Sequence, residues 1–173
     1  MHVAVRYVAG LAAVLLTGGA ALAQNNEDAL FITVPNPLTS SGVGYITNVV
    51  TARRNNPDHP VRYVVFDFNP QGKAAFTTTP DACNALAKFI RNLPGAQTIA
   101  FVHAKVSGHT VLPVLACKEL VMSKDGSLGE IAAEGVDPLT ADDVLAYQLR
   151  FERPSHFAIV QKMYDKDVIL GKA

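Results

Sequence analysis

Short apolar runs and segments with helical periodicity alternate along the chain between residues 29 and 123. The runs are rich in β-branched and aromatic residues, which favours strands. They cover residues 29–34, 61–68, 96–104 and 118–123. The second run, VRYVVFDF, is apolar almost throughout, as expected of a parallel strand covered on both faces. This alternation predicts an α/β fold with a mostly parallel sheet.

Helices are predicted between these strands. Residues 40–56 carry apolar side chains at helical spacing, with Ser40 or Ser41 available as the N-cap. The next helix has Thr79 as its N-cap and Pro80 at its first position. A third helix is expected directly after Ser107, and two more close the chain. Those two lie within residues 139–151 and 153–164.

The first 23 residues have the pattern of a secretory signal peptide. Arg6 precedes an apolar run from Tyr7 to Leu16, and the small residues ALA stand before Gln24. This predicts an exported protein, periplasmic or extracellular, with residues 24–173 as one domain. An uncleaved anchor is the other interpretation, but the run is shorter than the roughly 20 residues that a membrane span needs. No later stretch is long and apolar enough to cross a membrane.

Composition excludes some classes of function. Without residues 1–23 the chain has 14 basic and 15 acidic side chains, which does not suit binding to nucleic acid. No histidine or cysteine cluster has the spacing of a zinc site, and we predict neither a metal nor a cofactor. The two cysteines, Cys83 and Cys117, either form a disulfide or are small buried residues.

Three turn motifs follow one another at a defined spacing. They are DFNPQG at 67–72, KVSG at 105–108 and GSLG at 126–129. In this order they resemble the Clp protease/crotonase superfamily, and in particular the exported serine peptidases of the signal peptide peptidase A and NfeD type. The resemblance implies a single domain of stacked strand-strand-helix units that associates into homo-oligomers.

The resemblance also implies a catalytic site. Ser107 would be the nucleophile, and backbone N–H groups near Gln71, Gly72 and Gly108 would form the oxyanion hole. Acyl transfer needs donors aimed at the developing charge, and glycine lets the backbone approach a substrate closely. Gln71 replaces a glycine of the family turn, which a backbone donor tolerates at negative φ. The substrate would be an extended peptide or protein segment that adds to a sheet edge.

The general base of this site is not evident. A serine hydroxyl needs a lysine or histidine to take its proton. The family's histidine position falls in the stretch 130–133, and its lysine position in 138–147, and neither stretch contains that residue. Elsewhere, His109 is expected to face away from Ser107 on the helix surface, and His103 to be packed or solvated.

The lysines offer no clear base either. Lys105 stands close enough in sequence to lean over Ser107. Lys162, Lys166 and Lys172 are expected to be solvated unless a partner subunit brings one of them near.

Two hypotheses therefore remain, besides a helix N-cap role for Ser107. The first is an exported serine peptidase-like hydrolase that acts through Ser107. The second is a catalytically inactive Clp-fold module that works by peptide binding or assembly. A crotonase-like acyl-CoA enzyme is disfavoured, because coenzyme A belongs in the cytoplasm.

Overall fold

The computed structural model describes residues 28–58, 60–132, 134–137, 139–148, 154–165, 167–169 and 171. The predicted signal peptide lies outside them. Within these ranges, no helix combines the length and the hydropathy that a membrane crossing requires.

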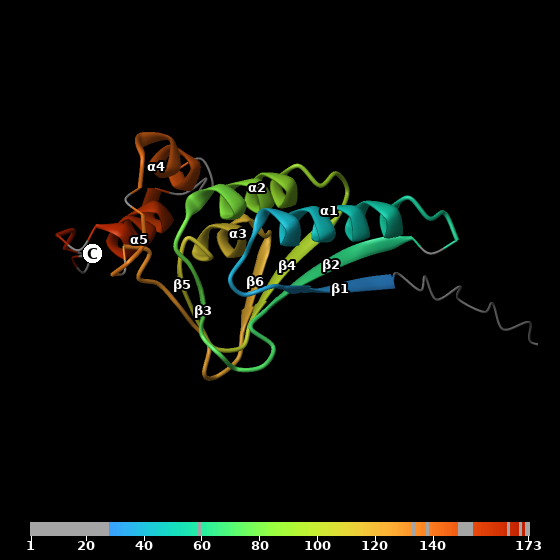
Figure 1. Ribbon diagram of the computed structural model, residues 1–173, viewed down its shortest axis with the longest axis horizontal. Helices are drawn as coiled ribbons and strands as arrows, with labels where there is room; N and C mark the ends of the chain where they lie inside the picture. The colour runs from blue at the N-terminus through green and yellow to red at the C-terminus, as the bar shows by residue number, and fades with distance from the viewer. Residues whose placement is uncertain are drawn as a thin grey trace, which may run out of the picture.

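Four parallel strands form the large sheet (Figure 1). They are β1 (Asp28–Val34), β2 (Val61–Phe68), β4 (Gln97–Val102) and β6 (Glu119–Met122), in the order β1-β2-β4-β6. All four predicted strands are therefore present, and each pair of neighbours is parallel. The third predicted strand is shorter than expected, because the chain leaves the sheet after Val102.

Three helices lie on one face of this sheet (Figure 1). They are α1 (Ser40–Arg54), α2 (Pro80–Arg91) and α3 (Val111–Ala116). The N-cap of α1 is Thr39, whose hydroxyl accepts from the Gly42 amide at 3.2 Å, so the prediction of Ser40 or Ser41 was wrong by one or two residues. Thr79 occupies the N-cap position of α2 as predicted, although its side chain makes no capping hydrogen bond, and Pro80 opens the helix. Near the C-terminus lie α4 (Ala141–Gln148) and α5 (Pro154–Tyr164).

A second, smaller sheet was not located from the sequence. Its strands are β3 (Ala75–Thr77), β5 (Lys105–Gly108) and β7 (Ser127–Leu128), in the order β3-β5-β7 and all parallel. Each of them follows a strand of the large sheet after a turn. The chain thus runs in strand-strand-helix units, as the resemblance implies.

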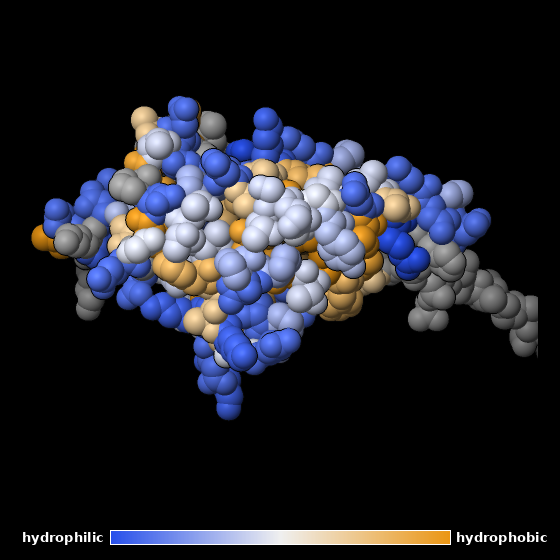
Figure 2. Space-filling view, viewed as in Figure 1, coloured by the Kyte–Doolittle hydropathy of each residue, from blue (hydrophilic) through white to orange (hydrophobic). Residues whose placement is uncertain are grey.

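The core fills the space between the large sheet and the helices. Val64, Phe66 and Ala100 point to this side from the central strands and have no exposed surface, and Ile46 and Leu86 meet them from α1 and α2. Figure 2 shows hydrophobic surface also on the outside of the molecule, along the side where β1 and β2 run. The two faces of the large sheet are therefore covered unequally.

Candidate functional site

Ser107 lies on a strand and not at the start of a helix. It is the third residue of β5, where it pairs with Phe76 of β3, and its exposed fraction is 6%. The expected helix begins only at Val111, because the His109 amide donates to the Thr77 carbonyl at 3.0 Å and keeps the chain on the strand ladder. The prediction that Ser107 opens the helix was therefore wrong.

The glycine amides assigned to the oxyanion hole both donate within the chain. The Gly72 amide donates to the Asn69 carbonyl at 2.9 Å, inside the turn that follows β2. The Gly108 amide donates to the Glu130 carbonyl at 3.1 Å, which links β5 to the segment after β7. In this conformation neither amide is available to a substrate oxygen. Their role as oxyanion donors stays a prediction.

The Ser107 hydroxyl has no bonded base among the described residues: no hydrogen bond joins it to a lysine or histidine nitrogen there. Lys105 instead forms an ion pair with Glu130. Lys166 and Lys172 lie outside the described residues.

His109 is fully buried, and the prediction of a surface position was wrong. Since α3 starts late, His109 lies in the turn between β5 and α3, beneath the segment that leads to α4. Its Nε2 lies 3.2 Å from the carbonyl oxygen of Asp137, so this nitrogen carries the proton. Its Nδ1 is buried and has no hydrogen-bond partner in the described structure.

A histidine–carboxylate pair was missed from the sequence. His103 Nε2 and Asp67 Oδ1 lie 2.6 Å apart at the carboxyl ends of β4 and β2, and both side chains are partly exposed. The His103 ring also contacts the Phe101 ring at a tilt of 50°, with ring centroids 4.2 Å apart. Strand alternation could have suggested the pair of His103 and Asp67, because residues 67, 101 and 103 face the same side of a parallel sheet.

Asn69 holds the turns together. Its φ is +51°, and its Oδ1 accepts from the amides of His103 (3.0 Å) and Ala104 (3.2 Å). Its Nδ2 donates to the carbonyl of Lys105 at 3.1 Å. Asn69 therefore fixes the start of β5, and with it the position of Ser107.

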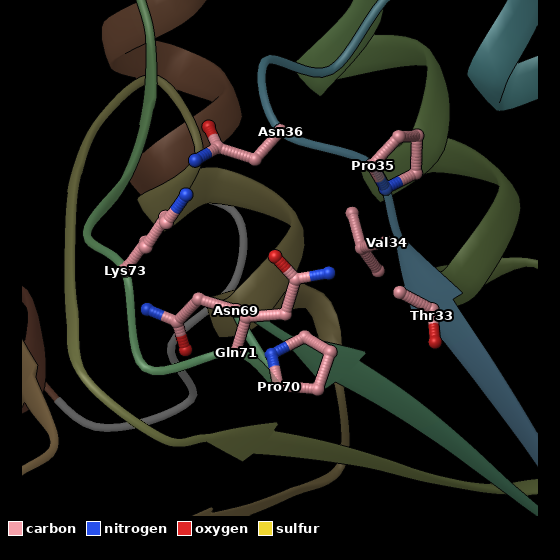
Figure 3. Close-up of a pocket in the computed structure, with 8 residues that line it drawn as sticks. All are labelled: Thr33, Val34, Pro35, Asn36, Asn69, Pro70, Gln71 and Lys73. Atoms are coloured by element: carbon pink, nitrogen blue, oxygen red, sulfur yellow. The ribbon is translucent and has the colours of Figure 1, made fainter.

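A cavity of about 320 Å³ lies beyond the carboxyl ends of β1 and β2, where open α/β sheets commonly bind ligands (Figure 3). It is lined by Thr33, Val34, Pro35, Asn36, Asn69, Pro70, Gln71 and Lys73. Of the predicted site residues only Gln71 lines it, and Ser107 and Gly108 do not. Among the described residues, no group of three or more His, Cys, Asp or Glu side chains could hold a metal ion.

Comparison with known proteins supports the fold. No protein-family model matches the chain, and no curated protein matches it. Among solved structures, the chain is similar to a Streptomyces avermitilis protein assigned to the enoyl-CoA hydratases, with a TM-score of 0.54 and 17% sequence identity. The match covers 78% of this chain and 57% of that protein. At this identity the likeness shows the fold alone: the chain is an α/β protein with parallel sheets and a crotonase-like fold.

Proposed function

We propose that this chain is a catalytically inactive crotonase-fold module that works by binding or assembly. One observation carries the proposal: the amides of Gly72 and Gly108 both donate to carbonyl groups of the chain itself. The low exposure of Ser107 supports it, as does the lack of a basic partner for its hydroxyl among the described residues.

The loss of rate expected without oxyanion donors and a general base favours an inactive site. Removing one oxyanion donor typically slows acyl transfer by about 10²–10³-fold. A missing general base costs a further 10²–10⁴-fold or so. With two donors occupied and no base bonded to it among the described residues, the Ser107 hydroxyl lacks the partners that would activate it in this conformation.

A fluorophosphonate probe, which reacts only with activated serines, tests whether Ser107 is inactive. We expect the same background labelling of the wild type and of Ser107→Ala. Ser127→Ala is the matched control, because Ser127 is an exposed serine on the neighbouring strand β7. Labelling of the wild type and of Ser127→Ala that disappears in Ser107→Ala would overturn the proposal.

The second candidate is the exported serine peptidase with Ser107 as nucleophile. It is favoured by the left-handed backbone of Gly108 (φ +58°) directly after Ser107, a conformation suited to a sharp turn beside a nucleophile. The activity requires the Glu130 carbonyl to leave the Gly108 amide. Export is part of both candidates, and a mature N-terminus at Gln24, read by mass spectrometry of the secreted protein, would support it.

A further inference from the structure

The cavity beyond β1 and β2 is enclosed by two loops (Figure 3). The loop after β1 supplies residues 33–36 of its lining, and the loop after β2 supplies four residues between 69 and 73. A volume of about 320 Å³ is at the lower end of the range for ligand pockets, which suits a small molecule. Because Ser107 does not line the cavity, a ligand here would be separate from the serine.

Two asparagines hold the walls of the cavity in place. Asn36 links the two loops, because its Nδ2 donates to the Ala74 carbonyl at 2.8 Å and its Oδ1 accepts from the Phe76 amide at 3.0 Å. Asn69 ties the second loop to residues 103–105 through the three bonds described above. Both side chains thus shape the cavity, and walls that are fixed in advance lower the entropic cost of binding.

Three other side chains of the lining are available to a ligand. Within the described part of the chain, no hydrogen bond or ion pair engages the side chains of Thr33, Gln71 and Lys73, and all three residues are exposed. Lys73 is the one charged residue of the lining. The segments 29–57 and 68–80, which include both loops, contain no acidic residue. The cavity therefore combines an uncompensated positive charge with neutral polar groups, which attracts an anion.

The rest of the lining is apolar. Val34 is buried, and the rings of Pro35 and Pro70 complete this part of the wall. Figure 3 shows Lys73 on the opposite side of the cavity from Val34 and Pro35. A ligand that satisfies both sides has an anionic group at one end and hydrocarbon at the other. One lysine balances a single negative charge, whereas a phosphate monoester carries almost two at pH 7. The lining therefore favours a carboxylate over a phosphate.

We propose that this cavity binds a small organic monocarboxylate, with the carboxylate at Lys73 and the hydrocarbon against Val34 and the two prolines. The ammonium group donates a charge-assisted hydrogen bond to the carboxylate, and Gln71 and Thr33 are the neutral groups available to it. The inference goes beyond the proposed function, because it assigns a ligand class to a cavity that excludes Ser107. It holds whether or not that serine reacts.

An NMR titration of the full chain with hexanoate tests the site. We expect saturable shifts of the amide signals of Val34 and Gln71, with a dissociation constant on the order of 1 mM for so small a ligand. Hexanamide, which has the same shape without the charge, should bind at least about tenfold more weakly. Hexyl phosphate should bind no more tightly than hexanoate.

Lys73→Met supplies the decisive variant. It keeps most of the side-chain volume and removes the charge, so the dissociation constant of hexanoate should rise at least about tenfold. Since Lys73 is exposed, the variant should fold like the wild type. Lys88→Met is the matched control, because Lys88 is an exposed lysine on α2 outside the lining. It should bind hexanoate like the wild type.

Four results would overturn the inference. They are the absence of saturable shifts at Val34 and Gln71 up to about 20 mM hexanoate, equal binding of hexanamide, tighter binding of hexyl phosphate, and unchanged binding in Lys73→Met. None of them bears on the proposed function, which fluorophosphonate labelling at Ser107 tests separately.

Discussion

The backbone amide of Gly108 donates to the carbonyl of Glu130 at 3.1 Å, directly after the serine that the family resemblance marks as a nucleophile. Both residues have left-handed backbones, with φ of +58° and +57°. For Glu130, a non-glycine residue, this conformation is strained and persists only because its surroundings impose it. The surroundings therefore hold the link between β5 and the segment after β7 in one defined conformation.

Gly108→Ala should destabilise the protein strongly. A Cβ at this position would lie 2.7 Å from the Thr77 carbonyl oxygen and 3.0 Å from the Phe76 ring, in a backbone conformation that disfavours side chains. Strain and overpacking together predict a loss of about 2–4 kcal/mol in the free energy of unfolding. Urea denaturation measures it.

Gly44→Ala is the control for this substitution. Gly44 is exposed within α1, and a Cβ there meets no atom within 4 Å. Alanine should raise the free energy of unfolding by about 0.5–1 kcal/mol through helix propensity alone. An equal effect of the two substitutions would contradict the packing described around Gly108.

Asn69→Ala should also be costly. The substitution removes an acceptor for the His103 and Ala104 amides and a donor to the Lys105 carbonyl. At about 1 kcal/mol for each of the three bonds, we expect a loss of about 3 kcal/mol in the free energy of unfolding, measured by urea denaturation. Asn69→Asp keeps the acceptor and loses only the donor, so it should be the milder change. A larger loss of stability in Asn69→Asp than in Asn69→Ala would contradict the role of the Asn69 side-chain oxygen as an acceptor.

Asp143 should make stability depend on acid pH. Burial alone would raise the pKa of its carboxyl, but hydrogen bonds from Thr140 and Asn84, and the charge of His109, outweigh it and hold the pKa below its ordinary value. A lowered folded-state pKa stabilises the fold above about pH 4 and loses that contribution as pH falls through the folded value.

The variant Asp143→Asn tests whether this carboxylate makes stability depend on acid pH. Between about pH 5 and pH 2, the urea midpoint should fall less steeply in Asp143→Asn than in the wild type. Asp142→Asn, at the exposed neighbouring position on α4, should follow the wild type. Parallel curves for the wild type and Asp143→Asn would refute the role of this carboxylate.

The large sheet and its helices were predictable because their signals are local. The run at 61–68 is apolar almost throughout, and the helix that starts at Pro80 carries its own cap and stop residues. The second sheet gave no such signal. Its strands are two to four residues long, too short for periodicity to register, and they are held by pairing with distant segments.

The wrong predictions at the candidate site follow from the missing second sheet. Because β5 was not foreseen, Ser107 was expected at a helix start, and His109 was expected on the helix surface. The amide of Gly108 was expected to be free, since its bond to Glu130 joins residues 22 positions apart. Glycine and serine patterns indicate where a turn can form, but the partner of each amide depends on tertiary pairing.

The two cysteines should differ sharply in reactivity. Neither forms a disulfide in the structure. Cys83 has no exposed surface, and burial raises the pKa of its thiol to about 12, although hydrogen bonds with Thr77 and Thr110 oppose this. Because the thiolate is the reactive species, Cys83 should not react with a disulfide reagent at pH 8 until the protein unfolds. Half-buried Cys117 should react first.

Each protein thiol that reacts releases one thiolate from the reagent, which can be counted. We expect one fast equivalent in the wild type and none in Cys117→Ser, while the equivalent from Cys83 should appear only in denaturant. A slow Cys117 and a fast Cys83 would contradict the described core between α2 and the large sheet.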